Sequence, residues 1–145
     1  MPPVLRQAAR LLVVDPDGRV LLFQYEDAGR RWWAAPGGGL EGDETFEEAA
    51  AREAAEELAV AHPSLTPLWA QTVEFTFRGE SIRQAERYFL MRLSGTDANL
   101  GESVQEAHRR EGIVASRWWS VEEVERTAEQ IFPVDLARRL RRLQP

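Results

Sequence analysis

The 145-residue sequence contains no cysteine, which excludes disulfide bonds, thiol catalysis and cysteine metal sites. Its only two histidines, His62 and His108, are too scattered to suggest a histidine metal site. Long apolar runs are also missing. The opening segment MPPVLRQAARLLVV is interrupted by Arg6, Gln7 and Arg10, so we expect neither a signal peptide nor a membrane-spanning helix. The expected location is therefore cytoplasmic.

Basic residues are in the minority, with 18 Lys and Arg against 24 Asp and Glu, for a formal net charge of -6. Proteins that bind duplex nucleic acid usually present a basic face, so this class of partner is disfavoured. An acidic chain can still bind a phosphorylated small molecule where metal ions mediate the contact. The length and the 43% of hydrophobic residues fit one domain, residues 1–145, with a sizeable core.

The order of apolar and polar segments predicts a mixed α/β or α+β fold, with helices inserted between strands. Predicted strands cover residues 9–14, 19–25, 31–36, 68–79, 80–93 and 113–119. Helices are predicted over 45–59, over 121–130 after an N-cap at Ser120, and over 134–143 after Pro133. The segment between Pro36 and Thr45, which contains three consecutive glycines, is predicted to be a loop.

The predicted helix at Thr45 opens with a capping box formed by Thr45 and Glu48. Helical periodicity gives it a core face of small and apolar residues: Ala51, Ala54, Ala55 and Leu58.

Three glutamates, Glu53, Glu56 and Glu57, share a neighbouring side of this helix, because residues three and four apart are neighbours. Each like-charged pair destabilises an exposed helix by about 0.2–0.5 kcal/mol, and the helix dipole disfavours acids near the C-terminus. Bound divalent cations would remove the repulsion, and Mg²⁺ or Mn²⁺ prefers oxygen ligands. The helix composition alone also fits a solvated acidic face that binds nothing.

The spacing of the glycines and acids adds a second signal. Five residues separate Gly38 from Glu44, and seven more precede the run REAAEELAV, which ends at Val60. This pattern resembles the Nudix box, which ends in Arg-Glu-apolar-x-Glu-Glu-x-Gly-apolar. The matching positions are Gly38, Glu44, Arg52, Glu53, Glu56 and Glu57, with Ala54 and Val60 at the apolar positions. Ala59 replaces the family glycine, where a positive φ would suit the helix end; alanine there either extends the helix or strains the backbone.

The resemblance implies a Nudix-type mixed β-sheet sandwiched between α-helices. It also implies an enzyme that hydrolyses a diphosphate linkage in a nucleoside diphosphate joined to another group. Mg²⁺ or Mn²⁺ would be held by Glu53, Glu56 and Glu57, with a backbone carbonyl of the glycine loop, and would activate a water molecule. The implied substrate-binding residues are Gly37, Gly38 and Gly39. Arg52 would orient Glu53 in the catalytic set, and Glu44 would support the junction between loop and helix.

The resemblance leaves the general base and the substrate open. The base of Nudix enzymes lies on the box helix in some members and on a later loop in others. The loop candidates here are Glu102, Glu106 and Glu111, and each of them also fits an ordinary solvent-exposed acid without a catalytic role. The substrate is a small nucleotide-like diphosphate: a nucleotide, a nucleoside triphosphate or a nucleotide sugar. The alternative function is a non-catalytic Nudix-fold module that binds a nucleotide or a protein.

Aromatic residues could stack on a nucleobase, and the candidates are Trp32, Trp33, Phe75, Phe77 and Tyr88. Adjacent tryptophans in a strand point to opposite faces, so at most one of Trp32 and Trp33 faces a pocket, and both also fit a core. The two tryptophan pairs, 32–33 and 118–119, are compatible with the surface of a homodimer and equally with a buried core.

Overall fold

The computed structural model describes residues 2–94 and 112–143. The chain divides into two compact units, which we describe separately. The first comprises Met1–Leu12 and Pro36–Met91, and the second comprises Val13–Ala35 and Arg92–Pro145. In the ranges that the structure describes, no helix is long and apolar enough to cross a membrane.

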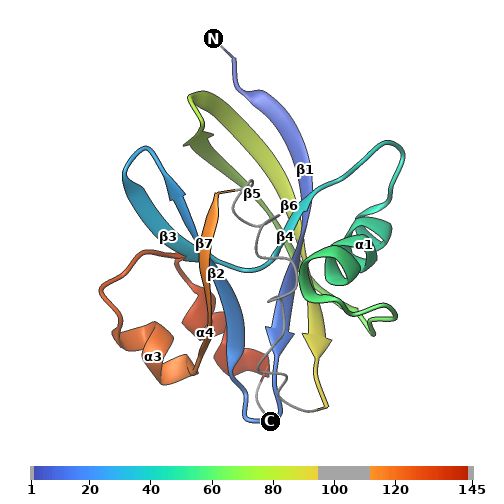
Figure 1. Ribbon diagram of the computed structural model, residues 1–145, viewed down its shortest axis with the longest axis vertical. Helices are drawn as coiled ribbons and strands as arrows, with labels where there is room; N and C mark the ends of the chain where they lie inside the picture. The colour runs from blue at the N-terminus through green and yellow to red at the C-terminus, as the bar shows by residue number, and fades with distance from the viewer. Residues whose placement is uncertain (1, 95–111, 144–145) are drawn as a thin grey trace. The chain divides into compact units, whose positions relative to one another are not determined.

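The first unit is built on three strands in the order β5 (Thr66–Phe77), β6 (Glu80–Arg92) and β1 (Val4–Val14). Strands β5 and β6 form a long antiparallel hairpin that lies alongside β1 (Figure 1). The two strands predicted at 68–79 and 80–93 are thereby confirmed. The short strand β4 (Gly37–Gly39) pairs antiparallel with β1 and leads into helix α1 (Phe46–Leu58).

The glycine stretch was predicted to be a loop, and this prediction was wrong. Gly38 pairs with Ala9 and Gly39 with Ala8 in strand β4. Gly37 has φ 141°, and a Cβ there would overlap the carbonyl oxygen of Ala9. Only glycine permits this approach of two backbones. Side-chain alternation cannot reveal a strand made of residues without side chains.

Helix α1 begins as predicted and ends one residue before Ala59. Thr45 and Glu48 form the capping box, with Thr45 Oγ1 accepting from Glu48 N–H at 3.1 Å. At the other end, Ala59 adopts a left-handed conformation with φ 58° and donates its N–H to the carbonyl of Ala55 at 3.1 Å. Of the two alternatives for this alanine, the structure therefore shows the strained backbone and not the longer helix.

The core face of α1 differs from the prediction. Ala54 and Leu58 are buried as expected, but Ala55 is exposed and Ala51 is only half-buried. The buried side is formed by Ala49, Ala50, Glu53, Ala54, Glu57 and Leu58. A prediction based on hydrophobicity places glutamates on the exposed side of a helix. Because Glu53 and Glu57 are buried, the buried side of α1 differs from the predicted one.

The second unit contains β2 (Val20–Asp27) between β3 (Arg30–Ala34) and β7 (Ile113–Trp119), all antiparallel. Strand β8 (Ile131–Phe132), which was not predicted, pairs parallel with β3, so the pairing is mixed as expected. Ser120 caps α3 (Val121–Arg126) as predicted, but α3 is shorter than expected, and α4 covers Leu136–Leu143.

Two tryptophans form the aromatic centre of the second unit. Trp33 packs edge-on against Trp119, with ring centroids 5.2 Å apart, and both are buried. Trp32 points to the other face of β3 and stacks on Tyr25 at 5.9 Å. One member of each tryptophan pair is therefore a core residue, and the homodimer stays a prediction.

Candidate active site

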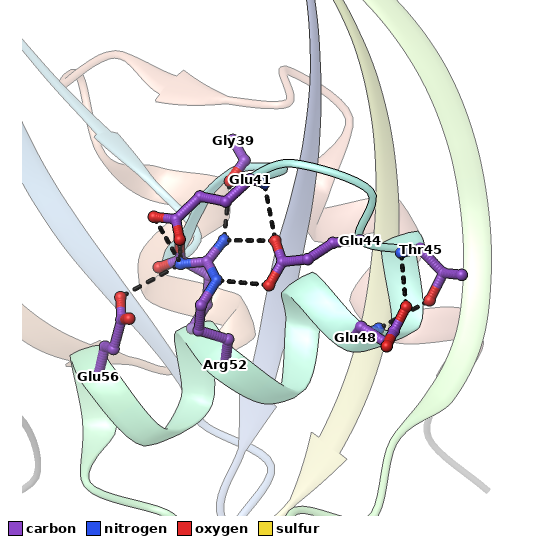
Figure 2. Close-up of polar contacts among 8 residues, drawn as sticks. Gly39, Glu41, Glu44, Thr45, Glu48, Arg52 and Glu56 are labelled. Atoms are coloured by element: carbon purple, nitrogen blue, oxygen red, sulfur yellow. Dashed lines mark hydrogen bonds and ion pairs between the residues drawn. The ribbon is translucent and has the colours of Figure 1, made fainter.

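Arg52 of α1 joins the helix to the segment that follows the glycines (Figure 2). Its Nε donates to Glu44 Oε2 at 2.7 Å and its Nη2 donates to Glu44 Oε1 at 3.0 Å. Nη2 also donates to the carbonyl oxygen of Gly39 at 2.9 Å. Nη1 donates to Glu53 Oε1 at 3.1 Å and to Glu56 Oε2 at 3.2 Å. The contact expected between Arg52 and Glu53 is therefore present.

Glu44 holds the loop as well as the arginine. Its Oε1 accepts from the backbone N–H of Glu41 at 2.8 Å, while its own N–H donates to the Glu41 carbonyl at 3.1 Å. The hydrogen bonds from Arg52, followed by the one from Glu41, hold the pKa of Glu44 below its ordinary value. The same pairing raises the pKa of Arg52. Glu44 thus lies at the loop–helix junction where the sequence placed it.

Glu53 lies directly against the glycine strand. A Cβ on Gly38 would be 2.6 Å from Glu53 Oε1, closer than a Cβ can approach, and 3.2 Å from Glu53 Cδ. Gly38 therefore leaves the space that the carboxylate occupies. Glu53 is only 6% exposed, so α1 and β4 together fix a charged group in a nearly buried position.

The backbone carbonyls of Gly37 and Gly39 face away from β1. Leu11 N–H donates to Pro36 O at 2.7 Å, and Leu40 N–H donates to Gln7 O at 3.0 Å. In an antiparallel ladder every second residue bonds to the same neighbour, so the residues between these bonding positions point their carbonyls outward. The bond from Arg52 to Gly39 O shows this directly. The strand can thus offer backbone oxygens beside Glu53.

The three box glutamates are not equivalent. Glu53 and Glu57, one helical turn apart, are 6% and 5% exposed, whereas the Glu56 side chain is 58% exposed and accepts from Arg52. Across residues 2–94 and 112–143, no three carboxylate or imidazole groups converge into a ready metal site. The donors still suit a hard cation, because Glu53 is buried in the space that a Cβ on Gly38 would fill and Glu57 is buried one helical turn later.

A model of the NUDIX domain matches residues 4–140. The chain belongs to the NUDIX domain family. It is a Nudix hydrolase, a pyrophosphohydrolase that acts on phosphoanhydride bonds, and it has the mixed α/β Nudix fold, so the predicted family, fold class and enzyme class are confirmed. Nudix enzymes typically use divalent metal ions.

Two curated relatives are both named RNA pyrophosphohydrolase. The chain is 30% identical over 133 residues to the protein of Sphingopyxis alaskensis, covering 83% of this chain and 81% of that one. It is 32% identical over 106 residues to the protein of Dinoroseobacter shibae, covering 66% of each. Among solved structures, the MutT NUDIX hydrolase from Burkholderia pseudomallei has a TM-score of 0.67 at 22% identity, covering 97% of this chain and 98% of that one.

The remaining candidates from the sequence are spread over the molecule. Glu102, Glu106 and Glu111, the loop candidates for the general base, lie outside the described residues. Phe75 and Phe77 are half-buried on β5. Of the five aromatic candidates, Tyr88 is buried on β6 and stacks on Trp69, at 4.3 Å between ring centroids.

A buried polar cluster on the first unit was missed. Glu86 of β6, 5% exposed, accepts from Arg10 Nε at 3.2 Å, from Gln71 Nε2 at 2.9 Å and from Gln84 Nε2 at 2.8 Å. A signal was available in the sequence: Gln84 and Glu86 fall on the same side of β6 as the buried Ile82, so alternation places polar groups on a covered face.

Proposed function

We propose that this Nudix hydrolase requires Mg²⁺ or Mn²⁺ and cleaves the 5′-polyphosphate of a nucleotide. Candidate substrates are nucleoside triphosphates, other nucleoside diphosphate conjugates and, from the names of the two curated relatives, the 5′ end of RNA. The observation that carries the proposal is the Glu53 carboxylate lying in the space left by Gly38, with Glu57 buried one turn later.

Glu53, Glu56 and Glu57 would hold the metal, with a carbonyl of the glycine strand. Bound there, the ion would neutralise phosphate charge and lower the pKa of a coordinated water. The protein's own part is positional. Arg52 keeps Glu53 aimed at the strand through its 3.1 Å bond, and Glu44 fixes Arg52. Gly37, Gly38 and Gly39 would bind the substrate through their backbone, since Glu53 occupies the space that a side chain at Gly38 would need.

The two compact units are proposed to form one Nudix domain, since the family match runs from residue 4 to 140 through both. A single domain of this size should unfold in one cooperative transition. Differential scanning calorimetry that gave two separate transitions would contradict the single-domain proposal.

The decisive experiment is a substrate panel with Mg²⁺ or Mn²⁺, monitoring released phosphate, pyrophosphate and nucleoside monophosphate. The panel contains nucleoside triphosphates, deoxynucleoside triphosphates, nucleotide sugars and a 5′-triphosphorylated RNA oligonucleotide. Turnover of at least one class is expected. If no compound is cleaved, the proposed function is wrong, and binding of the same compounds without turnover would favour the non-catalytic module.

Glu57→Gln tests the metal assignment. We expect kcat to fall by about a hundredfold or more, because ligand loss removes the stabilisation of phosphate charge. Isothermal titration with Mn²⁺ should show weaker binding to the variant. Glu122→Gln on α3, an exposed glutamate, is the matched control and should behave as the wild type. A Glu57→Gln enzyme with full rate and full Mn²⁺ affinity would refute the assignment.

A further inference from the structure

Arg6 of β1 lies against the glycine strand. A Cβ on Gly39 would be 3.1 Å from Arg6 Nη2 and 4.0 Å from Arg6 Nε. Gly38 and Gly39 are neighbours in a strand, so they face opposite sides, and Gly38 faces Glu53. Strand β4 is therefore flanked by a carboxylate on one face and by a guanidinium on the other.

Arg6 differs from the other two arginines near this strand. Arg52 directs its donors to Glu44, Glu53, Glu56 and the Gly39 carbonyl. Arg10, four residues along the same side of β1, is held by Glu86 at 3.2 Å. Arg6 is exposed and makes no hydrogen bond or ion pair within the described chain. It is thus the arginine of this group whose donors are available to a ligand.

The surroundings of β4 are rich in acidic side chains, so an unpaired arginine there would favour the binding of a phosphate. Glutamates 41, 44, 53 and 56 lie within 3.6 Å of Arg52, and Glu57 lies on the same helix as Arg52. A polyphosphate approaching this strand meets negative charge from that face. A guanidinium matches phosphate geometry and can donate two parallel hydrogen bonds.

From this arrangement we propose that Arg6 is a substrate-binding residue that donates to phosphate oxygens beside Gly39, on the face of β4 opposite Glu53. The inference rests on the proposed function, since it assigns a contact for the same polyphosphate. It adds a binding residue that lies outside helix α1 and outside the Gly38–Val60 motif, at the start of the chain.

Direct binding of inorganic pyrophosphate, titrated calorimetrically in the presence of Mg²⁺, tests this without requiring turnover. Arg6→Gln is expected to weaken binding about tenfold, the effect of losing a charge-assisted contact. The matched control is Arg142→Gln on α4, another exposed arginine with no ion pair in the described ranges, which should bind as the wild type. Should Arg6→Gln fail to fold, Arg6→Lys, which keeps the charge but loses the fork, should weaken binding about threefold.

Gly39→Ala gives a second, independent measurement. The new methyl group would lie 3.1 Å from Arg6 Nη2, so the guanidinium must shift by a few tenths of an ångström, and this shift should weaken pyrophosphate binding in the wild type. In the Arg6→Gln background the same change should have little further effect, because the guanidinium that it shifts is gone. Equal losses in both backgrounds would mean that Gly39 acts without Arg6 and would overturn the inference.

The kinetic signature separates this inference from the proposed function. With a cleaved substrate, Arg6→Gln should raise KM about tenfold and leave kcat within about twofold. The inference is wrong if Arg6→Gln binds pyrophosphate as tightly as the wild type, if Arg142→Gln loses as much, or if the wild type does not bind pyrophosphate. Pyrophosphate binding that depends on Arg6, in an enzyme that cleaves none of the panel, would support the inference and refute the proposed function.

Discussion

Arg52 and Glu44 are joined by two parallel hydrogen bonds, from Nε at 2.7 Å and from Nη2 at 3.0 Å, across eight positions of the chain. Such a bidentate pairing of guanidinium and carboxylate fixes the relative orientation of the two groups more strictly than one hydrogen bond does. Since Arg52 also binds the Gly39 carbonyl and Glu53, the position of one carboxylate on the loop determines how the helix meets the strand.

Arg52→Lys should therefore be a damaging change despite its conserved charge. A lysine ammonium cannot donate two parallel, coplanar hydrogen bonds to Glu44 while also reaching Gly39 and Glu53. We expect kcat/KM to fall about tenfold to a hundredfold, with a small loss of thermal stability. Arg83→Lys, at the exposed 2.7 Å ion pair with Glu74, is the control and should retain its rate. An Arg52→Lys enzyme with wild-type kcat/KM would contradict this role.

The stability of the fold should depend on the ionisation of Glu44 in acid. Its pKa is lowered in the folded chain, chiefly by the hydrogen bond from Arg52, so the folded state binds this proton less readily than the unfolded state. The contribution is complete above the ordinary value of 4.5 and is lost as the pH falls below it through the folded pKa. Glu44→Gln removes this dependence.

Urea unfolding of the wild type and of Glu44→Gln between pH 3 and 7 measures the contribution of Glu44 to the unfolding free energy at each pH. The difference in unfolding free energy should be constant above about pH 5 and should shrink towards pH 3. Glu80→Gln, an exposed glutamate at the start of β6, is the control. A difference between wild type and Glu44→Gln that does not vary with pH would argue against the pairing in solution.

Gly38→Ala should reduce catalysis more than stability. Its methyl group would lie 2.6 Å from Glu53 Oε1, so the carboxylate must move. Displacement of a catalytic group by about 1 Å can cost about a hundredfold in rate, and we expect kcat to fall by that order. Gly42→Ala is the matched control: its backbone has φ 54° but no atom lies within 4 Å of the new Cβ, so it should lose stability and keep its kcat. Equal kcat for the two variants would refute the Gly38–Glu53 contact as a functional one.

Ala59→Gly should stabilise the protein. Alanine in the left-handed conformation at φ 58° carries a steric cost that glycine avoids, which after the larger entropy of the unfolded glycine chain leaves a gain of about 0.5–1 kcal/mol. Ala55→Gly, at an exposed position within α1, should instead destabilise the protein by about 1 kcal/mol. Chemical denaturation of both variants gives the comparison. A less stable Ala59→Gly variant would show that the helix end is not under strain.

The sequence was most informative where side-chain pattern decides structure. The capping box at Thr45, the N-cap at Ser120 and the hairpin of β5 and β6 follow local rules that need no partner, and they are present. The resemblance implied the contact of Arg52 with Glu53 and the place of Glu44 at the loop–helix junction, and the structure adds the pairing of Arg52 with Glu44.

Features that depend on distant backbone were not predictable in the same way. Strand β4 has no side chains to show a period of two, and its pairing with β1 depends on a close approach at Ala9. The buried face of α1 was misplaced because Glu53 and Glu57 are covered by tertiary structure against their hydrophilic preference. The sequence did not indicate a contact of Arg6 with the glycines, because nothing local connects it to Gly39, which lies across the strand pair.

The three consecutive glycines have an evolutionary consequence. A side chain at Gly37 meets the Ala9 backbone, one at Gly38 meets Glu53 and one at Gly39 meets Arg6. Purifying selection would therefore act on the three codons through different traits. In a saturation mutational scan, substitutions at 37 should lower cellular abundance, those at 38 should lower turnover at normal abundance, and those at 39 should be rescued by raising the substrate concentration.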